Sequence, residues 1–192
     1  MNFFKRILNI KSSEHNEAEK QEVALSLDDL FVHNFIGKGG KFLYCIKQEE
    51  ILKNLKSILS ENNWNDIQLL DKNLSKLLDS DIKVLEKNRS SPILTSCEHL
   101  IAESGDILFS SNQLGSNKIP ELSDNFIVYA TTSQLVKNTG EGLTGIKINN
   151  KESLPTNISA IKNYNIKNSD DNFLNYGNSN SKNLYLLLFE DL

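Results

Sequence analysis

Cysteine is scarce in this chain of 192 residues: only Cys45 and Cys97 occur, with no Cys-x-x-Cys pair. Two distant cysteines do not make the disulfide framework of a small secreted protein, and they indicate a reduced, cytoplasmic setting. They also cannot supply the four thiolates of an iron–sulfur cluster within one chain. The sequence therefore predicts no cluster and no cofactor of its own.

Long apolar runs and a strong charge of one sign are missing as well. No run approaches the ~18 apolar residues that a transmembrane helix needs, so we expect no membrane span. The net charge is -4, and such a mildly acidic chain has no general attraction for nucleic acid. Hydrophobic residues make up 39% and charged residues 24%, which is the balance of a folded globular protein.

The first 25 residues differ from the rest of the chain. Residues 11–24 are polar and show no periodic apolar pattern, so we interpret residues 1–25 as an N-terminal segment and linker. Ser26 followed by Asp29 resembles a capping box, which marks the start of a helix. We therefore expect one α/β domain over residues 26–192.

Helical and strand patterns alternate along this domain. Residues 49–59 carry a single apolar stripe at helical spacing, and residues 98–103 fit either a helix or an irregular strand. After Ser133 a helix could begin, although three glycines soon interrupt the pattern. Short apolar segments predict strands at 41–46, 65–70, 92–95, 106–110, 125–131, 158–161 and 184–189. This alternation predicts a mostly parallel sheet flanked by helices.

The glycine-rich stretch at residues 37–40 invites comparison with a phosphate-binding loop. A Walker loop follows a strand and precedes a helix, because the helix N-terminus supplies free N–H groups to the phosphate. Here a predicted helix comes first and a strand follows, and Phe42 stands where Ser or Thr would bind magnesium. We interpret Gly39 and Gly40 as a structural turn past the end of a helix.

The densest polar cluster is Cys97-Glu98-His99 with Glu103. These side chains can ligate metals, but their spacing matches no standard metal site, so we predict none. Cysteine catalysis has little support, because Cys45 lies in a predicted strand where a thiol is buried and inert.

The stretch Glu103-Ser104-Gly105 precedes a buried strand. A carboxylate at such a turn can lie in the crevice where α/β sheets bind ligands, although a plain surface turn is the other reading. Glu103 is the best candidate for a catalytic residue. Lys118 could offer a positive charge to an anion, although a lone lysine is ordinarily a solvated surface group. The candidate ligand-binding residues are Thr95, Glu98, Glu103, Ser104, Gly105 and Lys118.

Three stretches together resemble the lactate utilization protein B/C (LUD domain) family, and its protein C branch in particular. They are FVHNFIGKGGKFLYC at 31–45, SPILTSCEHLIAESGDILFSS at 91–111 and NKIPELSDNFIVYA at 117–130. The resemblance covers about residues 27–192. It implies a NagB/RpiA/CoA transferase-like fold, and a role in bacterial oxidation of L-lactate to pyruvate beside iron–sulfur oxidoreductase subunits.

The C-terminal region departs from the family pattern. Only Ser169, Asp170 and Asp171 stand where family members carry Gly-Pro-Ser and an acidic segment, and residues 178–181 lack the histidine and proline of the family's last turn. If that turn shapes a ligand pocket, the pocket is altered here.

Three hypotheses follow. In the first, the chain is an accessory, non-catalytic subunit of a lactate-oxidising system. In the second, it is a stand-alone enzyme that acts on an anionic substrate, with Glu103 as nucleophile or general base. In the third, it is a divergent binding or regulatory module. The resemblance favours the first.

Overall fold

The computed structural model describes residues 25–86, 88–164 and 181–191. The N-terminal segment and most of the linker, and the C-terminal departures at 169–171 and 178–180, lie outside these described residues. In the described part of the chain, no helix combines the length and the apolar character that crossing a membrane requires.

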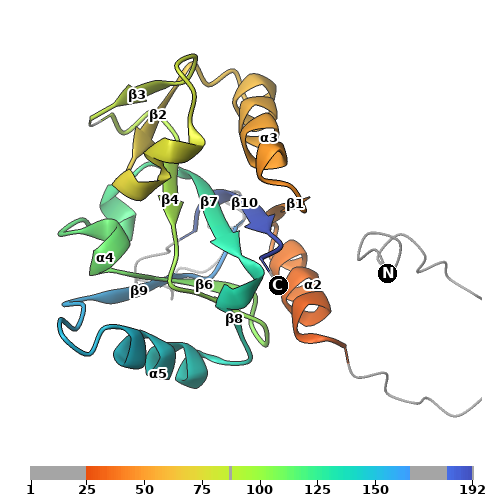
Figure 1. Cartoon of the computed structure of the whole chain (residues 1–192), viewed down its shortest axis with the longest axis vertical. Helices are drawn as coiled ribbons and strands as arrows, with labels where there is room; N and C mark the ends of the chain where they lie inside the picture. The colour runs from red at the N-terminus through yellow and green to blue at the C-terminus, as the bar shows by residue number, and fades with distance from the viewer. Residues whose placement is uncertain (1–24, 87, 165–180, 192) are drawn as a thin grey trace, which may run out of the picture.

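A six-stranded sheet, here called sheet A, forms the centre of the molecule (Figure 1). All its neighbouring strands are parallel, in the order β1-β10-β7-β4-β2-β3. The bounds of these strands are β1 Lys41–Cys45, β2 Asp66–Leu69, β3 Lys83–Leu85, β4 Ile93–Ser96, β7 Asn125–Thr131 and β10 Asn183–Phe189. The predicted parallel sheet is therefore confirmed.

A second sheet of four strands, sheet B, packs against sheet A, in the order β8-β5-β6-β9. Strands β5 and β6 form an antiparallel hairpin, which resolves the ambiguity at 98–103 in favour of a strand. The strands are β5 His99–Ile101, β6 Asp106–Ser110, β8 Leu135–Val136 and β9 Ile158–Ile161.

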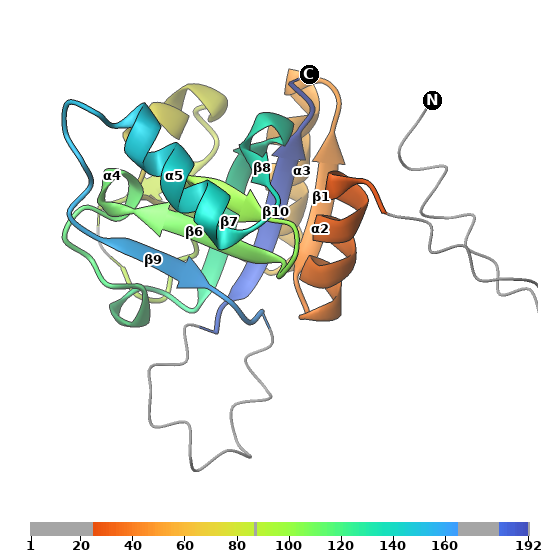
Figure 2. The same ribbon diagram turned by 90° about the horizontal axis from the view of Figure 1, so that it is seen from below.

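The helices lie on both sides of the two sheets (Figures 1 and 2). Helix α3 covers one face of sheet A, and α5 lies on the outer face of sheet B, while α2 runs beside β1 and β8. The remaining helices are short connections. The bounds are α2 Leu27–Gly37, α3 Gln48–Glu61, η1 Lys72–Leu77, α4 Ser111–Leu114, η2 Ile119–Glu121, η3 Thr132–Gln134 and α5 Thr139–Asn149.

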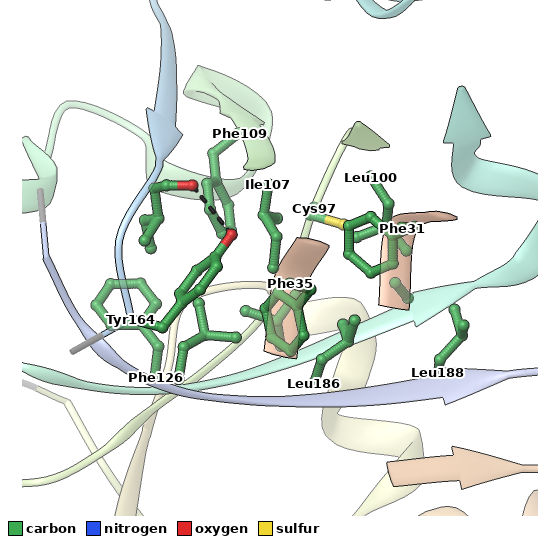
Figure 3. Close-up of a cluster of buried hydrophobic side chains, with 14 of the residues drawn as sticks. Phe31, Phe35, Cys97, Leu100, Ile107, Phe109, Phe126, Tyr164, Leu186 and Leu188 are labelled. Atoms are coloured by element: carbon green, nitrogen blue, oxygen red, sulfur yellow. Dashed lines mark hydrogen bonds between the residues drawn. The ribbon is translucent and has the colours of Figure 1, made fainter. Parts of the chain in front are cut away.

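Two hydrophobic cores result, one on each face of sheet A. The smaller core lies under α3 and includes Ile51, Leu55 and Ile67. The larger core lies between sheets A and B and below α2; Figure 3 shows Phe35 between Phe31 and Tyr164 within it. The ring centroids of Phe35 and Tyr164 are 4.5 Å apart. Strands buried on both faces need continuous apolar runs, as in residues 184–189.

Both predicted ends of α2 are confirmed. The Ser26 side chain accepts a hydrogen bond from the Asp29 amide at 3.4 Å. After the helix, Gly39 takes a φ of 89°, a conformation that only glycine adopts without cost. A Cβ atom on Gly40 would lie 2.4 Å from the ring of Phe35. The glycine stretch therefore serves the helix end, as the sequence predicted.

The expected interruption by glycines after Ser133 is wrong. A 3-10 turn and β8 come first, and α5 then runs through all three glycines, from Thr139 to Asn149. A Cβ on Gly142 would lie 2.9 Å from Leu108, and one on Gly145 would lie 2.7 Å from the His99 ring. These glycines let α5 approach sheet B closely, and the packing offsets their low helix propensity.

Strands β2 and β4 are joined at both ends by a matching pair of side chains. Ser91 donates a hydrogen bond to Asp66 where the strands begin, and Ser96 donates one to Asp71, at 2.5 Å, where they end. Each pair spans 25 residues of sequence. Because the carboxylates accept these bonds, they are charge-assisted and help to hold the register of the two strands.

Candidate functional site

Four of the six predicted ligand-binding residues, Glu98, Glu103, Ser104 and Gly105, lie on or beside the β5–β6 hairpin, whose turn is formed by residues 102–105. Gly105 has a φ of 68°, and a Cβ there would lie 2.6 Å from the backbone nitrogen of Phe35. Both observations require glycine, the first for the backbone conformation and the second for space. The 102–105 turn therefore lies directly against α2.

Polar contacts hold this turn in place. The Asn34 amide group donates to the carbonyl oxygens of Ala102 at 2.9 Å and Glu103 at 3.2 Å. The Tyr164 hydroxyl donates to the Gly105 carbonyl at 2.6 Å. Burial, with the nearby charge of Asp106, raises the pKa of Tyr164, so this hydroxyl keeps the proton that it donates. We call the 102–105 turn with these partners the α2 joint.

Asp106, the first residue of β6, adds an ion pair to the α2 joint. Its carboxylate lies 2.6 Å from the Lys38 Nζ, just past the end of α2, and its side chain is only 10% exposed. The backbone on the other side of the turn pairs with β8, because the Glu103 amide donates to the Lys137 carbonyl at 3.0 Å. Hydrogen bonds and packing thus hold the 102–105 turn in place on both of its sides.

The Glu103 side chain, by contrast, points away from the joint. It is 49% exposed, and its closest cation is Lys137 Nζ at 4.0 Å, itself 63% exposed. Solvent screens a pair of this kind, so it contributes little to stability. A carboxylate that acts as nucleophile or base must be positioned and desolvated, and neither condition holds for Glu103 in this structure.

Glu98 lies at the other end of the three-residue strand β5. Its Oε1 atom accepts hydrogen bonds from Ser110 Oγ at 2.5 Å, Asn112 Nδ2 at 3.0 Å and Gln113 Nε2 at 3.0 Å. These donors stand at the junction of β6 and α4, where Ser110 is the helix N-cap. One carboxylate oxygen with three donors ties β5 to the start of α4 and has little capacity left for a ligand.

His99 is buried beneath α5. Its Nδ1 donates to the Gln134 carbonyl at 3.2 Å, since a carbonyl oxygen can only accept. The Nε2 atom is buried without a hydrogen-bond partner among the described residues, against Gly145. Gln134 in turn donates to the carbonyl of Cys97 at 2.5 Å. These contacts fasten η3 to the strand below it.

The other predicted residues do not join Glu103. Thr95 is fully buried in β4 and donates to the Ser96 carbonyl at 3.0 Å. Lys118 is exposed at the start of η2. Ser104 stays in the α2 joint, where its hydroxyl accepts from the Asp106 amide at 3.4 Å. The structure thus brings Glu103, Ser104 and Gly105 together and separates them from Glu98 and Lys118.

Both cysteines are buried and unpaired. Burial raises the pKa of Cys97, and the charge of Glu98 raises it further. Burial also raises the pKa of Cys45, partly offset by a hydrogen bond from Asn54. Raised pKa values keep both thiols protonated and poorly nucleophilic at neutral pH. Within residues 25–86, 88–164 and 181–191, no group of three or more histidine, cysteine and acidic side chains is placed to hold a metal ion.

A polar cluster that the sequence analysis missed lies at the carboxyl ends of β7 and β10. Asp191 accepts hydrogen bonds from Thr132 Oγ1 at 2.8 Å and from Ser133 Oγ at 2.7 Å. Partial burial raises the pKa of Asp191, but these hydrogen bonds outweigh it and lower the pKa to about 2. The run Thr131-Thr132-Ser133 directly after a strong strand was the available signal. We call this cluster the Asp191 clasp.

Comparison with known proteins gives one structural likeness. No family model matches the chain, and no curated protein matches it. The solved structure of a DUF162 family protein from Deinococcus radiodurans matches with a TM-score of 0.58 and 14% identity. The match covers 86% of this chain and 99% of that chain. At this identity the likeness shows a shared fold.

Proposed function

We propose that this chain is an accessory, non-catalytic protein of bacterial lactate utilization, of the protein C type. In this role it would work beside iron–sulfur oxidoreductase subunits that oxidise L-lactate to pyruvate. The observation that carries the proposal is the fold shared with a DUF162 family protein over nearly the whole of that protein. DUF162 is a name of the LUD-domain family, and the three stretches at 31–45, 91–111 and 117–130 resemble the same family.

The geometry around the β5–β6 hairpin is consistent with a non-catalytic role. The family-like residues at 102–105 are taken up by the α2 joint, and Glu98 is taken up by its three donors. These residues build a rigid framework, in which Glu98 and Asp106 are engaged by partners within the chain while Glu103 is half exposed. Electrons from lactate would then pass through the cofactors of partner subunits.

The alternative of a stand-alone enzyme on an anionic substrate depends on Glu103 as nucleophile or base. Glu103 is half exposed, with its nearest cation at 4.0 Å, which gives this alternative less support. A stand-alone enzyme of this kind would lose turnover on Glu103→Gln without losing its fold.

Affinity purification tests the proposal. The tagged chain is purified from its native cells grown on lactate and, as a control, on a sugar, and bound proteins are identified by mass spectrometry. We expect an iron–sulfur oxidoreductase in near-equal amounts with the bait from lactate-grown cells. The Glu103→Gln variant should recover the same partner. Recovery of the chain alone under both conditions would overturn the proposal.

A further inference from the structure

A cavity of about 280 Å³ lies apart from the α2 joint and the Asp191 clasp. Its wall comes from β2, from the turn that precedes β4, and from the segment between α4 and β7. The lining residues that matter here are Gln68, Asn88, Arg89, Asn117, Glu121 and Ser123. Its volume is at the lower end of the range for small-molecule sites. We call it the amino-end pocket, because β4 and β7 begin beside it.

Gln68 is, with Ser123, one of the two buried polar residues that line this pocket. It is only 7% exposed, and its neighbours Ile67 and Leu69 pack into the core under α3. Strand alternation therefore directs Gln68 to the opposite face of sheet A. Its carboxamide makes no hydrogen bond to any residue in the described ranges, whereas buried amides are ordinarily paired. Among the described residues only His99 Nε2 is a fully enclosed side-chain atom without a partner, so the amide atoms of Gln68 are accessible from the cavity and offer both a donor and an acceptor to a ligand.

Two opposite charges line the same cavity. Neither Arg89 nor Glu121 belongs to an ion pair with another described residue, and both side chains are exposed. A guanidinium group binds a carboxylate through two parallel hydrogen bonds. A carboxylate such as Glu121 binds an ammonium group. Together they offer complementary contacts for a molecule that carries both charges.

The remaining polar groups add to this set. The Asn88 oxygen accepts from Ser90 Oγ at 2.6 Å, which leaves the Asn88 NH₂ group free to donate. Asn117 donates its NH₂ group to the Leu114 carbonyl at 2.8 Å, which leaves its oxygen free to accept. The Ser123 hydroxyl accepts from the Asn125 amide at 3.3 Å and keeps its own proton for a ligand.

Hydrogen bonds outside the pocket fix the segments that form its walls. Lys182 has a side chain that is 3% exposed; its Nζ donates to the Leu122 carbonyl at 3.3 Å and lies 3.1 Å from Asp124. The hydrogen bond from Ser91 to Asp66 fastens the turn that carries Arg89. A site whose supporting groups are fixed loses less entropy when it binds a ligand.

We propose that the amino-end pocket binds a free α-amino acid. In this assignment Arg89 and the Asn88 amide hold the carboxylate, Glu121 and the Asn117 oxygen hold the ammonium group, and Gln68 contacts the side chain. The pocket is separate from the α2 joint and does not depend on the lactate role. A failure here therefore leaves the proposed function standing.

Isothermal titration calorimetry on the full-length protein tests this assignment. The probes are L-serine, L-asparagine and L-alanine as amino acids, with L-lactate and acetate as carboxylates that lack the ammonium group. We expect saturable binding of at least one of the amino acids and at least tenfold weaker binding of L-lactate and acetate. Equal binding of L-lactate and the amino acids would overturn the amino-acid assignment, and no binding of any probe at millimolar concentrations would overturn the site.

Variants locate the binding in the pocket. Arg89→Gln and Glu121→Gln change exposed side chains, so the fold should survive, and each should weaken amino-acid binding about tenfold or more, as expected from the loss of one charge-assisted contact. Lys83→Gln changes an exposed cation on β3 outside the pocket and is the matched control. If Arg89→Gln and Lys83→Gln bind alike, the pocket is not the site.

Discussion

The α2 joint and the amino-end pocket are both rich in polar groups, but they use them differently. In the joint, polar side chains are used within the chain: Asn34 and Tyr164 donate to the carbonyls of residues 102, 103 and 105. In the pocket, the side chains of Gln68, Arg89 and Glu121 form no hydrogen bond or ion pair with other residues in the described part of the chain. The sequence predicted candidate site residues in the joint, whereas it predicted none of the residues that line the pocket.

The comparison shows two different reasons why an unexpected residue type stands at a position. One reason is packing within the fold, and the other is a role outside the fold. Gly105 is required because a Cβ would clash with the backbone of α2. Close packing therefore explains why this residue is glycine. The Gln68 side chain makes no hydrogen bond within the described residues, although its backbone amide donates to the Pro92 carbonyl at 2.8 Å, so the fold does not explain why an amide stands at this position. Side chains that face a cavity without a partner in the fold, such as Gln68, are therefore better markers of a ligand site here than the 102–105 motif.

The largest expected effect is at Gly105. Gly105→Ala should lower the free energy of unfolding by about 3 kcal/mol, because it adds a strained φ and a clash with backbone atoms. Chemical denaturation measures the loss. Gly37→Ala is the control, because nothing lies within 4 Å of a Cβ at that position, and it should be neutral or stabilising by up to about 1 kcal/mol. Equal effects of the two changes would remove the packing explanation.

Asn34 tests the polar half of the joint. Asn34→Ala removes the donor to two carbonyls of the turn and should cost about 1–3 kcal/mol of stability. Hydrogen exchange of residues 102–105 should also speed up, since α2 no longer holds the turn. His33→Ala changes an exposed neighbour on the same helix and should leave both measurements unchanged. An Asn34→Ala protein as stable as the wild type would contradict the joint.

Gln68 tests the pocket side of the comparison. Gln68→Leu should change stability by less than about 1 kcal/mol, or increase it, because the side chain makes no hydrogen bond within the described residues and leucine is of similar size. The same variant should lose amino-acid binding. The control is Asn62→Leu, because Asn62 donates to Ile58 and Tyr185 and its loss should cost about 1–3 kcal/mol. A large loss for Gln68→Leu would mean that the amide supports the fold.

The Asp191 clasp extends the comparison to a more exposed joint. The pKa of Asp191 is lowered from 3.8 to about 2 in the folded protein, so the clasp contributes fully above about pH 4 and is lost as the pH falls towards 2. Asp191→Asn should cost less than about 1 kcal/mol at neutral pH, because the site is solvated. Thermal unfolding of both proteins should differ at neutral pH and converge at acid pH; a constant difference would contradict the assignment.

Glu103 is expected to show the smallest effect. Glu103→Gln should change stability by less than about 0.5 kcal/mol, because the side chain is half exposed and weakly paired. Glu98→Gln is the matched control, since it weakens a carboxylate with three donors and should cost about 1–3 kcal/mol. Differential scanning calorimetry compares the two. If Glu103→Gln were the more damaging change, the side chain of Glu103 would have a role in the joint.

Local signals in the sequence predicted much of the framework. The Ser26 cap, the glycine turn at 39–40 and the apolar stripe of α3 depend on residues near each other in the chain, so their periodicity and chemistry are readable directly. The continuous apolar run of β10 indicated a strand buried on both faces. The fold class followed from the order of these elements.

Other features could not be predicted from the sequence, and α5 illustrates the physical reason. Its three glycines predicted an interruption, because local propensity disfavours glycine in a helix. The observed helix depends on Leu108 and His99, which are distant in sequence and close only in the folded protein. The same limit applies to sheet B, whose strands are short and whose pairing no local pattern reveals.

The sequence by itself therefore determined the ends of α2, the central strands and the α/β class, because these depend on contacts within a few residues. Only the tertiary structure decided the uses of the polar residues. Glu98 and the 102–105 turn became parts of the framework because distant donors reach them, while Gln68, Arg89 and Glu121 came together unpaired around one cavity. Whether a polar group is satisfied depends on which partners the whole fold brings within hydrogen-bond distance.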